Sequence, residues 1–352
     1  MIYKREMYRV AITVSVINYK GGVGKTTSAF NLGIGLSFLV NARVLLIDLD
    51  PQCSLTTIGL KAFSRTLKKP MTLPKLDPES TINQVFREYL RETALGIPAT
   101  ISLDDVILRD FYAGETSRLP NVSLIPATMF DASDGYPKGL DDLEIEMAMQ
   151  SGGRETRLRQ LSFLPRFFTQ THLENQFDFI LFDCPPANNL VTQNALVVSD
   201  YYVIPTVMDD MSANGIVHLH SLIHHSIFGN IQKEYRDIIE RNDAVPYFQY
   251  FQSEPKLLMI FETLRKTGTQ NTSTLMDVQR IFPQQLVNDV VIYHHVDTAR
   301  ATGRGTAVFS TNLEKDVYSP HVTYGNLVLK FLDKLNMSYD KGAASARIND
   351  WL

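Results

Sequence analysis

A glycine-rich turn, set between an apolar run and a helical pattern, limits the folds open to this chain. It lies in the stretch Val14–Thr27, which reads VSVINYKGGVGKTT. The first residues are apolar and rich in β-branched side chains, as is typical of a buried strand. A helical pattern begins at Thr26. A strand, a glycine-rich turn ending in Gly-Lys-Thr and a helix are the parts of the phosphate-binding P-loop.

The residue types of this turn suit a triphosphate. Gly21, Gly22 and Gly24 have no Cβ, so backbone N–H groups can crowd around phosphate oxygens. The positive N-terminal end of the following helix also attracts the negatively charged phosphates. We expect Lys25 to reach the β and γ phosphates and Thr26 to give its hydroxyl to Mg²⁺. The alternative, a turn with two solvated lysines, is disfavoured by the length of the match.

The motif departs from the strict pattern at its first position. Tyr19 stands where a glycine is expected, and Lys20 directly precedes the double glycine. The sequence Lys-Gly-Gly-Val-Gly-Lys-Thr-Thr resembles the deviant Walker A motif of the ParA/MinD family of ATPases. The resemblance implies that Lys20 crosses a dimer interface to the partner's nucleotide, which makes it a catalytic candidate beside Lys25. The predicted nucleotide-binding residues are Lys20, Gly21, Gly22, Val23, Gly24, Lys25, Thr26 and Thr27.

Two acidic residues follow a second apolar run. Val44–Ile47 is continuously apolar, as in a central parallel strand, and Asp48 and Asp50 stand at its carboxyl end. That edge of an open α/β sheet carries ligands. Asp-x-Asp-Pro-Gln also resembles the switch I region of the family, which implies that Asp50 orients or activates the attacking water and that Asp48 lies near the magnesium. The alternative is a turn capped by Asp before Pro51.

A third apolar run, Phe179–Phe182, ends in Asp183 and is followed by Cys-Pro-Pro. This is the Walker B arrangement, in which a buried strand delivers a carboxylate towards Mg²⁺, usually through water. Asp-Cys-Pro-Pro is also the form this motif takes in the family. The predicted metal-binding residues are therefore Thr26, Asp48 and Asp183. Cys184 is better interpreted as a small packed residue than as a nucleophile.

Strand and helix patterns alternate along the chain and predict an α/β fold. We expect a doubly wound, mainly parallel sheet with helices on both faces, as in P-loop NTPases. The chain is predicted to be one domain, residues 1–352, with an inserted or elaborated region at about 60–120. Ser54–Gly59 is expected to be a loop, and Ser80–Leu90 a helix capped by Ser80. The predicted strands are Val14–Ile17, Val44–Ile47, Val122–Ile125, Phe179–Phe182, Tyr202–Ile204, Leu257–Phe261 and Val290–Tyr293.

The amino-acid composition limits the classes of protein to which the chain can belong. Hydrophobic residues make up 44% and charged residues 20% of the chain, as in globular proteins. The net charge of −4 does not argue for nucleic acid, although a local basic patch still could. Two cysteines provide neither a disulfide framework nor a zinc motif, which fits a reducing cytosol. The beginning of the chain is too short and polar for a signal peptide. No long apolar run predicts a membrane span.

Two further groups of residues are candidates for binding. Thr298–Thr306 resembles the family segment before the last helix, and its Arg300 and Arg304 could touch DNA phosphates. A flexible basic loop without function is the alternative. His220 and His224 are four residues apart and could share a helix face as metal ligands, although a buried or solvated pair is favoured.

The resemblance also implies an activity. It implies Mg²⁺-dependent ATP hydrolysis, slow and stimulated by a partner, by a protein that is a homodimer in its ATP state. The expected use is plasmid or chromosome partitioning. The expected partners are non-specific DNA and a centromere-binding or other activating protein. The expected location is cytoplasmic, with nucleoid association as an option. MinD-type relatives end in a basic amphipathic helix that binds membrane, and the tail at 336–352 lacks one.

Two other functions remain open. The chain could be a positioning or regulatory ATPase that acts through protein contacts of the region 60–120, without DNA. A weaker alternative is an iron–sulfur reductase of the same fold class, with the cysteines of two chains holding a cluster. Both cysteines lie beside nucleotide motifs, where they suit packing better.

Overall fold

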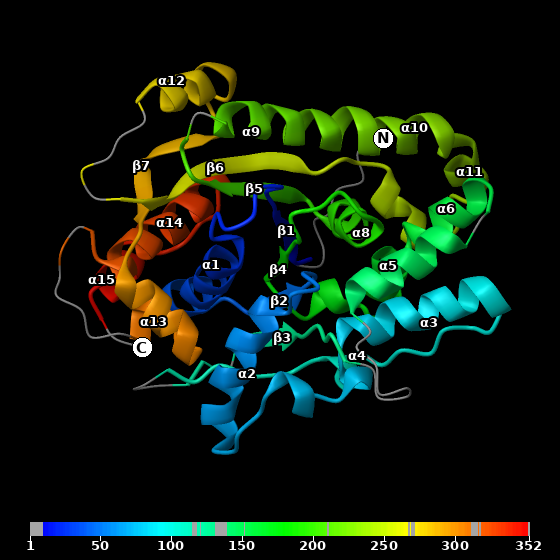
Figure 1. The fold of residues 1–352 in the computed structure, drawn as a ribbon, viewed down its shortest axis with the longest axis horizontal. Coiled ribbons are helices and arrows are strands. Elements are labelled where there is room, and N and C mark those ends of the chain that lie inside the picture. The colour runs from blue at the N-terminus through cyan, green and yellow to red at the C-terminus, as the bar shows by residue number, and fades with distance from the viewer. Residues whose placement is uncertain are drawn as a thin grey trace.

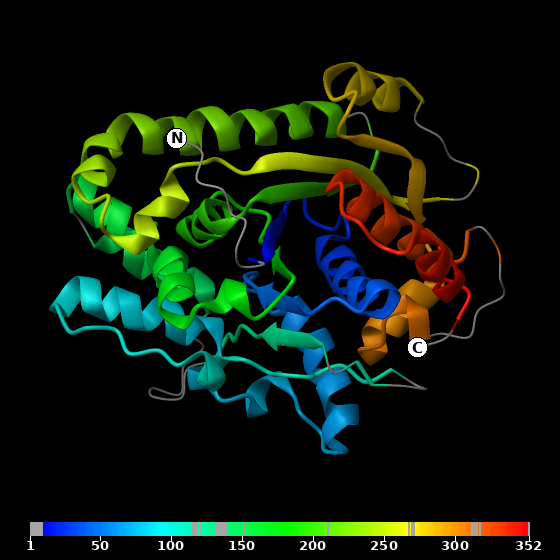
Figure 2. The ribbon, with the colours of Figure 1, turned by 180° about the vertical axis from the view of Figure 1, so that it is seen from behind.

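A seven-stranded parallel sheet lies between two layers of helices in the computed structural model (Figures 1 and 2). The structure describes residues 10–114, 118–119, 121–130, 139–150, 152–209, 211–266, 268, 272–310, 316 and 318–350. The strand order is β3-β2-β4-β1-β5-β6-β7, and every neighbouring pair is parallel. The predicted doubly wound sheet is therefore confirmed. The strands are β1 (Ile12–Val16), β2 (Val44–Asp48), β3 (Val122–Ile125), β4 (Phe179–Asp183), β5 (Tyr201–Thr206), β6 (Lys256–Arg265) and β7 (Leu286–Tyr293).

Helices cover both faces of this sheet. One layer contains α1 (Lys25–Val40), α2 (Ser54–Leu67), α13 (Val296–Arg304), α14 (Pro320–Lys334) and α15 (Lys341–Arg347). The other layer contains α3 (Ile82–Leu95), α4 (Leu103–Val106), α5 (Leu140–Met149), α6 (Arg154–Gln160), α7 (Phe163–Thr171), α8 (Leu190–Val198), α9 (Ser212–Ser221), α10 (Gly229–Glu234) and α11 (Arg236–Arg241). A π-helical segment, Leu222–Phe228, joins α9 to α10, and α12 (Thr272–Ile281) packs on α9.

The central strands are continuously apolar because each contributes to two cores. In β4, Phe179 and Leu181 pack with α1 and α14, whereas Ile180 and Phe182 pack with the opposite helical layer. Successive side chains of a strand point to opposite faces of a sheet, so both sets must be apolar when both faces are covered. The apolar runs were therefore sufficient to predict these strands.

The first helix ends at Asn41 and lies close to the sheet. α1 stops at Asn41, whose left-handed backbone (φ 56°) lets its N–H donate to the carbonyl of Ser37 and the N–H of Ala42 donate to that of Leu36. Gly33 faces β2, where a Cβ would lie 2.6 Å from a methyl carbon of Leu46. Glycine at this position therefore lets α1 lie directly on β2.

Several local predictions were wrong at the level of single elements. The predicted loop Ser54–Gly59 is the beginning of α2, whose Leu55, Ile58 and Ala62 face the core. Threonines, a glycine and a lysine lie between these positions, so the helical spacing of the apolar residues was not recognised in the sequence. α3 begins after Thr81 instead of Ser80, which belongs to a preceding 3₁₀ turn. The sequence reasoning also missed α5 and α15.

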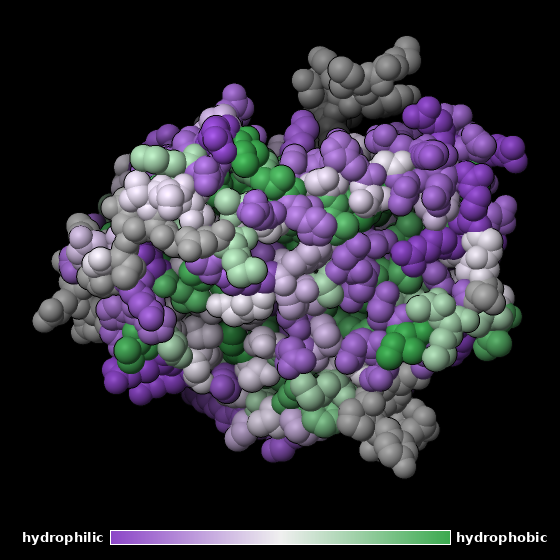
Figure 3. All heavy atoms as spheres, turned by 45° about the horizontal axis from the view of Figure 1, so that its top comes forward, coloured by the Kyte–Doolittle hydropathy of each residue, from purple (hydrophilic) through white to green (hydrophobic). Residues whose placement is uncertain are grey.

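The region at about 60–120 packs onto the same core as the rest of the chain. Val85, Phe86 and Tyr89 of α3 are fully buried, and Phe86 and Tyr89 contact the ring of Phe163. The division into one domain with an inserted region stays a prediction. Hydrophilic side chains cover most of the face in Figure 3, with hydrophobic ones in small separate areas. Nowhere in the described part of the chain does a helix have the length and apolar character that crossing a bilayer requires.

Candidate nucleotide-binding site

The predicted site residues meet where three neighbouring strands end. Val16 of β1 pairs with Asp183 of β4, and Asp183 pairs with Asp48 of β2. Because the strands are parallel, their carboxyl ends lie at one edge of the sheet, and the P-loop leaves β1 there. The fold thus brings together three motifs that are far apart in the sequence.

A cleft of about 710 Å³ opens over the P-loop, within the ordinary range for small-molecule sites. A Cβ placed on Gly21 or Gly22 would meet no atom within 4 Å, so the space above the turn is open. Gly22 (φ 71°) and Gly24 (φ 78°) have left-handed backbones, which favour glycine. The P-loop contributes Gly21, Gly22, Gly24, Lys25, Thr26 and Thr27 to the lining.

Val23 does not line this cleft but supports it from behind. Its side chain is buried, and its carbonyl accepts a 2.8 Å hydrogen bond from the Thr263 hydroxyl of β6. The P-loop is therefore anchored to a strand more than two hundred residues away in the sequence.

Lys25 is a buried cation at the start of α1. Only 7% of its surface is exposed, and its Nζ donates to the carbonyl of Lys20 at 3.2 Å. Burial lowers the pKa of Lys25, while the nearby carboxylates of Asp183 and Asp50 oppose that shift. An anionic ligand in the cleft would compensate the buried charge.

Asp183 is the residue whose surroundings most clearly fit a cation. Its side chain is fully buried, and neither carboxylate oxygen has a partner with regular hydrogen-bond geometry among the described residues. Burial, and then the neighbouring Asp48, raise the pKa of Asp183 well above its usual value, although the nearby Thr26 hydroxyl lowers it. An unpartnered carboxylate beside a hydroxyl is an oxygen donor set that fits Mg²⁺.

Asp48 is held differently from Asp183. One oxygen accepts from both the N–H and the hydroxyl of Thr56 at 2.7 Å, and the other accepts from the N–H of Asp50 at 3.1 Å. Burial raises the pKa of Asp48 to about 7, against these hydrogen bonds. The Thr56 hydroxyl also accepts from the N–H of Ala127 at 2.7 Å. Asp48 therefore ties the loop after β2 to α2, and its role at the metal stays a prediction.

Asp50 lines the same cleft as the P-loop, and its role at the attacking water stays a prediction. It lines the cleft with 9% of its surface exposed, and one carboxylate oxygen accepts from the N–H of Gln52 at 2.9 Å. Cys53 and Cys184 nearby are buried and free, and burial raises the pKa of Cys184 to about 12. This supports their interpretation as packed residues.

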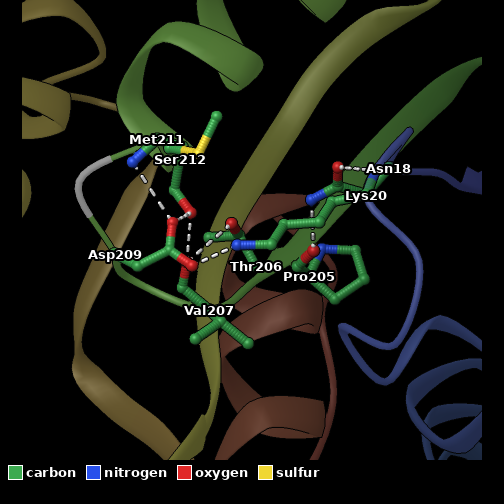
Figure 4. A network of polar contacts seen from close by, with 8 residues as sticks. All are labelled: Asn18, Lys20, Pro205, Thr206, Val207, Asp209, Met211 and Ser212. Carbon is green, nitrogen blue, oxygen red and sulfur yellow. Dashed lines mark hydrogen bonds and ion pairs between the residues drawn. The ribbon is translucent and has the colours of Figure 1, made fainter.

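Lys20 points away from the cleft that contains Lys25. Figure 4 shows its Nζ paired with the carboxylate of Asp209, in the loop after β5. The Lys20 backbone N–H donates to the side chain of Asn18 at 2.9 Å, and the Asn18 amide donates to the carbonyl of Pro205 at 2.9 Å. The structure therefore holds Lys20 against its own protomer, at the rim of the site.

The far wall of the cleft comes from elements that the sequence reasoning missed. Lys61 of α2 donates to the carbonyl of Gly303 at 2.8 Å, and Arg65 donates to the carbonyls of Arg304 and Gly305, both at 2.6 Å. Gly305 needs to be glycine because a Cβ would lie 2.6–2.7 Å from α2. The lining residues missed from the sequence are Gln52, Ser54, Thr57, Ile58, Lys61, Pro186, Leu264, Thr302 and Gly303.

The two DNA candidates lie at the end of this wall. Arg300 and Arg304 belong to α13, so the predicted loop is largely a helix. Both side chains are exposed, and Arg300 pairs with Asp297 at 3.3 Å. Their predicted contact with DNA stays a prediction.

The histidine pair contacts a tyrosine. The hydroxyl of Tyr202 lies 2.6 Å from Nδ1 of His220 and 3.1 Å from Nε2 of His224, and Nδ1 of His224 lies 3.0 Å from a carboxylate oxygen of Glu254. No group of three or more histidine, cysteine or acidic side chains suited to a metal ion occurs in the part of the chain that the structure describes. The favoured interpretation as a packed pair fits this geometry.

A doubly wound parallel sheet, with a P-loop after its first strand and buried carboxylates on the adjoining strands, defines a P-loop nucleotide-binding protein. The sequence profile of the AAA_31 family, described as an AAA domain, matches residues 11–239. The chain belongs to this family, and its relatives place it in the ParA/MinD family that the Walker A sequence indicated.

The curated relatives are 30% identical to this chain over the part that aligns. The sporulation initiation inhibitor protein Soj of Bacillus subtilis is 30% identical over 207 residues, which are 58% of this chain and 62% of Soj. The chromosome partitioning protein ParA of Caulobacter vibrioides is 30% identical over 206 residues, 58% of this chain and 60% of ParA. An uncharacterised protein of Mycobacterium tuberculosis is 30% identical over 212 residues, 60% of this chain and 52% of that protein. The chain thus matches between half and two thirds of each relative.

Solved structures share the fold at lower identity. McdA from Cyanothece, in complex with ATP, has a TM-score of 0.59 at 17% identity, covering 94% of this chain and 98% of McdA. A plasmid partition protein from Borrelia burgdorferi, bound to AMPPNP, has a TM-score of 0.56 at 17% identity, covering 93% of this chain and 98% of that protein. These likenesses establish the fold.

Proposed function

We propose that this chain is a Mg²⁺-dependent ATPase that dimerises when ATP is bound and acts in plasmid or chromosome partitioning. The observation that carries the proposal is the buried carboxylate of Asp183, which lacks a regular hydrogen-bond partner and lies beside Thr26, at the end of the strand paired with β1. The names of the relatives, which include chromosome partitioning proteins, support the biological setting. The ATP and AMPPNP bound to proteins of the same fold support the ligand.

The residues of the cleft would act mainly by position and charge. The backbone N–H groups of the P-loop would surround the phosphates, and Lys25 would pair with the β and γ phosphates. Thr26 and Asp183 would hold Mg²⁺, which when bound neutralises charge on the phosphates. Asp50 would orient the water that attacks the γ phosphate. Phosphoryl transfer requires little more from a protein than such positioning and electrostatic stabilisation.

Lys25→Ala tests the binding half of this proposal. Removing a buried cation that pairs with phosphate should weaken ATP binding by about 10- to 150-fold, the equivalent of one charged hydrogen bond. Isothermal titration with ATP and Mg²⁺ measures the change. Lys68→Ala, at the exposed end of α2, is the control and should bind as the wild type does. Unchanged affinity in Lys25→Ala would reject the role of the P-loop.

Asp50→Ala tests the hydrolytic half. This variant should bind ATP and dimerise, yet release no phosphate, because it lacks the group that orients the water. Phosphate release and sedimentation velocity measure the two properties on the same sample. A variant that hydrolyses ATP at the wild-type rate would contradict the assignment of Asp50.

We also propose that an exposed basic surface on α2 and α13 binds DNA non-specifically. The two helices lie side by side in Figures 1 and 2 and are joined by the hydrogen bonds of Arg65 and Lys61. Thr302 and Gly303 of α13 also line the nucleotide cleft, so nucleotide and DNA would contact the same short helix. This shared helix could make DNA binding depend on ATP. The surface consists of Lys61, Lys68, Lys69, Arg300 and Arg304.

A mobility shift on duplex DNA, with and without ATP, tests this surface. The double variant Arg300→Gln/Arg304→Gln should lose affinity, and its salt dependence should become shallower by about 0.9 for each phosphate contact removed. Arg280→Gln is a matched control, because Arg280 is exposed and pairs with Asp277 at 3.3 Å, as Arg300 does with Asp297. Absence of any ATP-dependent shift would reject DNA binding and favour a positioning ATPase that acts through proteins.

A further inference from the structure

We propose that Glu144 is a positioning residue for hydrolysis, which fixes the loop between Asp183 and α8 by binding the first turn of that helix. The inference rests on the proposed function, because it assumes that the cleft hydrolyses ATP. The loop, residues 184–189, contains Pro186, which lines the cleft. Glu144 belongs to α5 and does not itself line the cleft, so it would act only through the loop.

The carboxylate of Glu144 binds the first two backbone N–H groups of α8. Its Oε1 accepts from the N–H of Leu190 at 2.9 Å, and its Oε2 accepts from the N–H of Val191 at 3.1 Å. Burial raises the pKa of Glu144, whereas these hydrogen bonds and the nearby Arg157 oppose that shift. The first N–H groups of a helix lack partners within it and attract negative charge. The first turn of α8 contains no acidic residue, so Glu144 supplies that charge from another helix.

The loop is fixed at both of its ends. At its beginning, the N–H of Cys184 donates to the carbonyl of Val16 in β1 at 3.2 Å. At its end, the side chain of Asn189 accepts from the N–H of Thr192 at 2.9 Å. Glu144 and Asn189 together thus satisfy the first three N–H groups of α8. Removing the carboxylate of Glu144 would release part of the second anchor and leave the first unchanged.

α5 is held in place by contacts that do not involve Glu144. Leu143 and Met147 are buried in the core, and the carbonyl of Met147 accepts from Nε2 of Gln160 at 2.6 Å. The side-chain amide of Asn194 in α8 donates in turn to the carbonyl of Gln160 at 2.8 Å. Loss of the Glu144 carboxylate should therefore loosen the start of α8 without separating the two helices.

The loop lies beside the segment that contains Asp50, which orients the water in the proposed function. β2 and β4 are neighbours, with Asp48 opposite Asp183, so the segments that follow them leave the sheet side by side. One segment contains Asp50 and the other Pro186, and both residues line the cleft. The P-loop is anchored to β6, so its hold on the phosphates would not depend on α8. A displaced loop should thus affect hydrolysis more than nucleotide binding.

Glu144→Gln, assayed for phosphate release with saturating ATP and Mg²⁺, tests the inference. Glutamine has nearly the same shape but a single acceptor oxygen and no charge, so one N–H of α8 loses its partner. The kcat should fall by about 10- to 100-fold, the effect of a small displacement near reacting groups. The Kd for AMPPNP, from isothermal titration, should stay that of the wild type. Glu240→Gln, at an exposed position of α11, is the control and should change neither quantity.

Pro186→Gly separates a positioning role from a purely structural one. If Glu144 acts through the loop, Glu144→Gln should lower kcat far less in a Pro186→Gly background, because residues that act together are not additive. A purely structural role would lower the melting temperature and leave the kcat of the folded protein unchanged in both backgrounds. That result would overturn the inference.

The outcomes also separate this inference from the function on which it rests. A wild type that binds AMPPNP but releases no phosphate from ATP would reject the proposed hydrolysis and the inference with it. An active wild type with unchanged kcat in Glu144→Gln, or with AMPPNP binding weakened as much as kcat, would overturn only the inference. If Glu144→Gln does not fold, Asn189→Ala removes the other support of the same turn. It should lower kcat by a smaller factor, and an unchanged kcat would overturn the inference.

Discussion

Replacing Thr56 with valine would remove the hydroxyl that joins three segments behind the nucleotide cleft. This hydroxyl donates to Asp48, at the end of β2, and accepts from the N–H of Ala127, after β3, both at 2.7 Å. Thr56 itself belongs to α2 and is fully buried. Valine has nearly the same shape, so the substitution removes hydrogen bonds without opening a cavity.

The cost can be worked out from these two contacts. A hydrogen bond to a charged group contributes about 1.5–3 kcal/mol, and a buried N–H left without a partner costs about 1–3 kcal/mol. Thr56→Val should therefore lower the free energy of unfolding by about 2.5–6 kcal/mol. The backbone N–H of Thr56 still donates to Asp48, so the carboxylate keeps part of its support.

Urea unfolding without nucleotide, followed by circular dichroism, measures this loss. Thr57→Val is the matched control: Thr57 is the next residue of α2 and lines the cleft, and its hydroxyl makes no hydrogen bond to any described residue. The control should stay within about 0.5 kcal/mol of the wild type, as most substitutions away from buried networks do. A Thr56→Val protein as stable as the control would refute the argument that this hydroxyl joins the three segments.

Three other variants test separate features. Gly24→Ala places a Cβ on a residue with a left-handed backbone. It should lower the free energy of unfolding by about 1–2 kcal/mol and weaken ATP binding in titrations. Gly153→Ala, at φ −69° with open space around it, is the control and should change neither quantity. Arg65→Met removes the hydrogen bonds to the end of α13 and should lower the free energy of unfolding in urea by about 1.5–3 kcal/mol. An unchanged value would argue against a stabilising role of these hydrogen bonds between α2 and α13. Burial, and then His224, lower the pKa of His220 below its usual 6.5, so the unfolded chain takes up the proton more readily. Stability should therefore fall as pH drops below 6.5, and His220→Gln should flatten that fall between pH 7 and 5; a parallel pH profile would contradict it.

The strands and the phosphate end of the site could be predicted because their signals are local. A strand covered on both faces must be apolar at successive positions, as in Phe179–Phe182, and this pattern is visible without knowing its neighbours. The P-loop needs glycines, a lysine and a hydroxyl at fixed spacing within a few residues. Asp48, Asp50 and Asp183 were found because each directly follows such a strand or its first turn.

The far wall of the cleft could not be predicted, because the contacts that form it join residues far apart in the sequence. α2 was interpreted as a loop because threonines, a glycine and a lysine lie between its core-facing Leu55, Ile58 and Ala62. The end of α13 joins it through Arg65 and Gly305, which are 240 residues apart. A contact between backbone carbonyls and a distant side chain leaves no periodic pattern in the sequence.

The sequence alone thus determined the parallel sheet and the position of the P-loop after its first strand, since both depend on short runs of residue types. The tertiary structure decided which of the acids is hydrogen-bonded within the fold: Asp48 accepts from the Thr56 hydroxyl, whereas Asp183 is buried without a regular partner among the described residues. It also decided that Lys20 pairs with Asp209, 189 residues further along the chain. Such pairings arise only when separate strands end at one edge of the sheet, so no single stretch of sequence contains them.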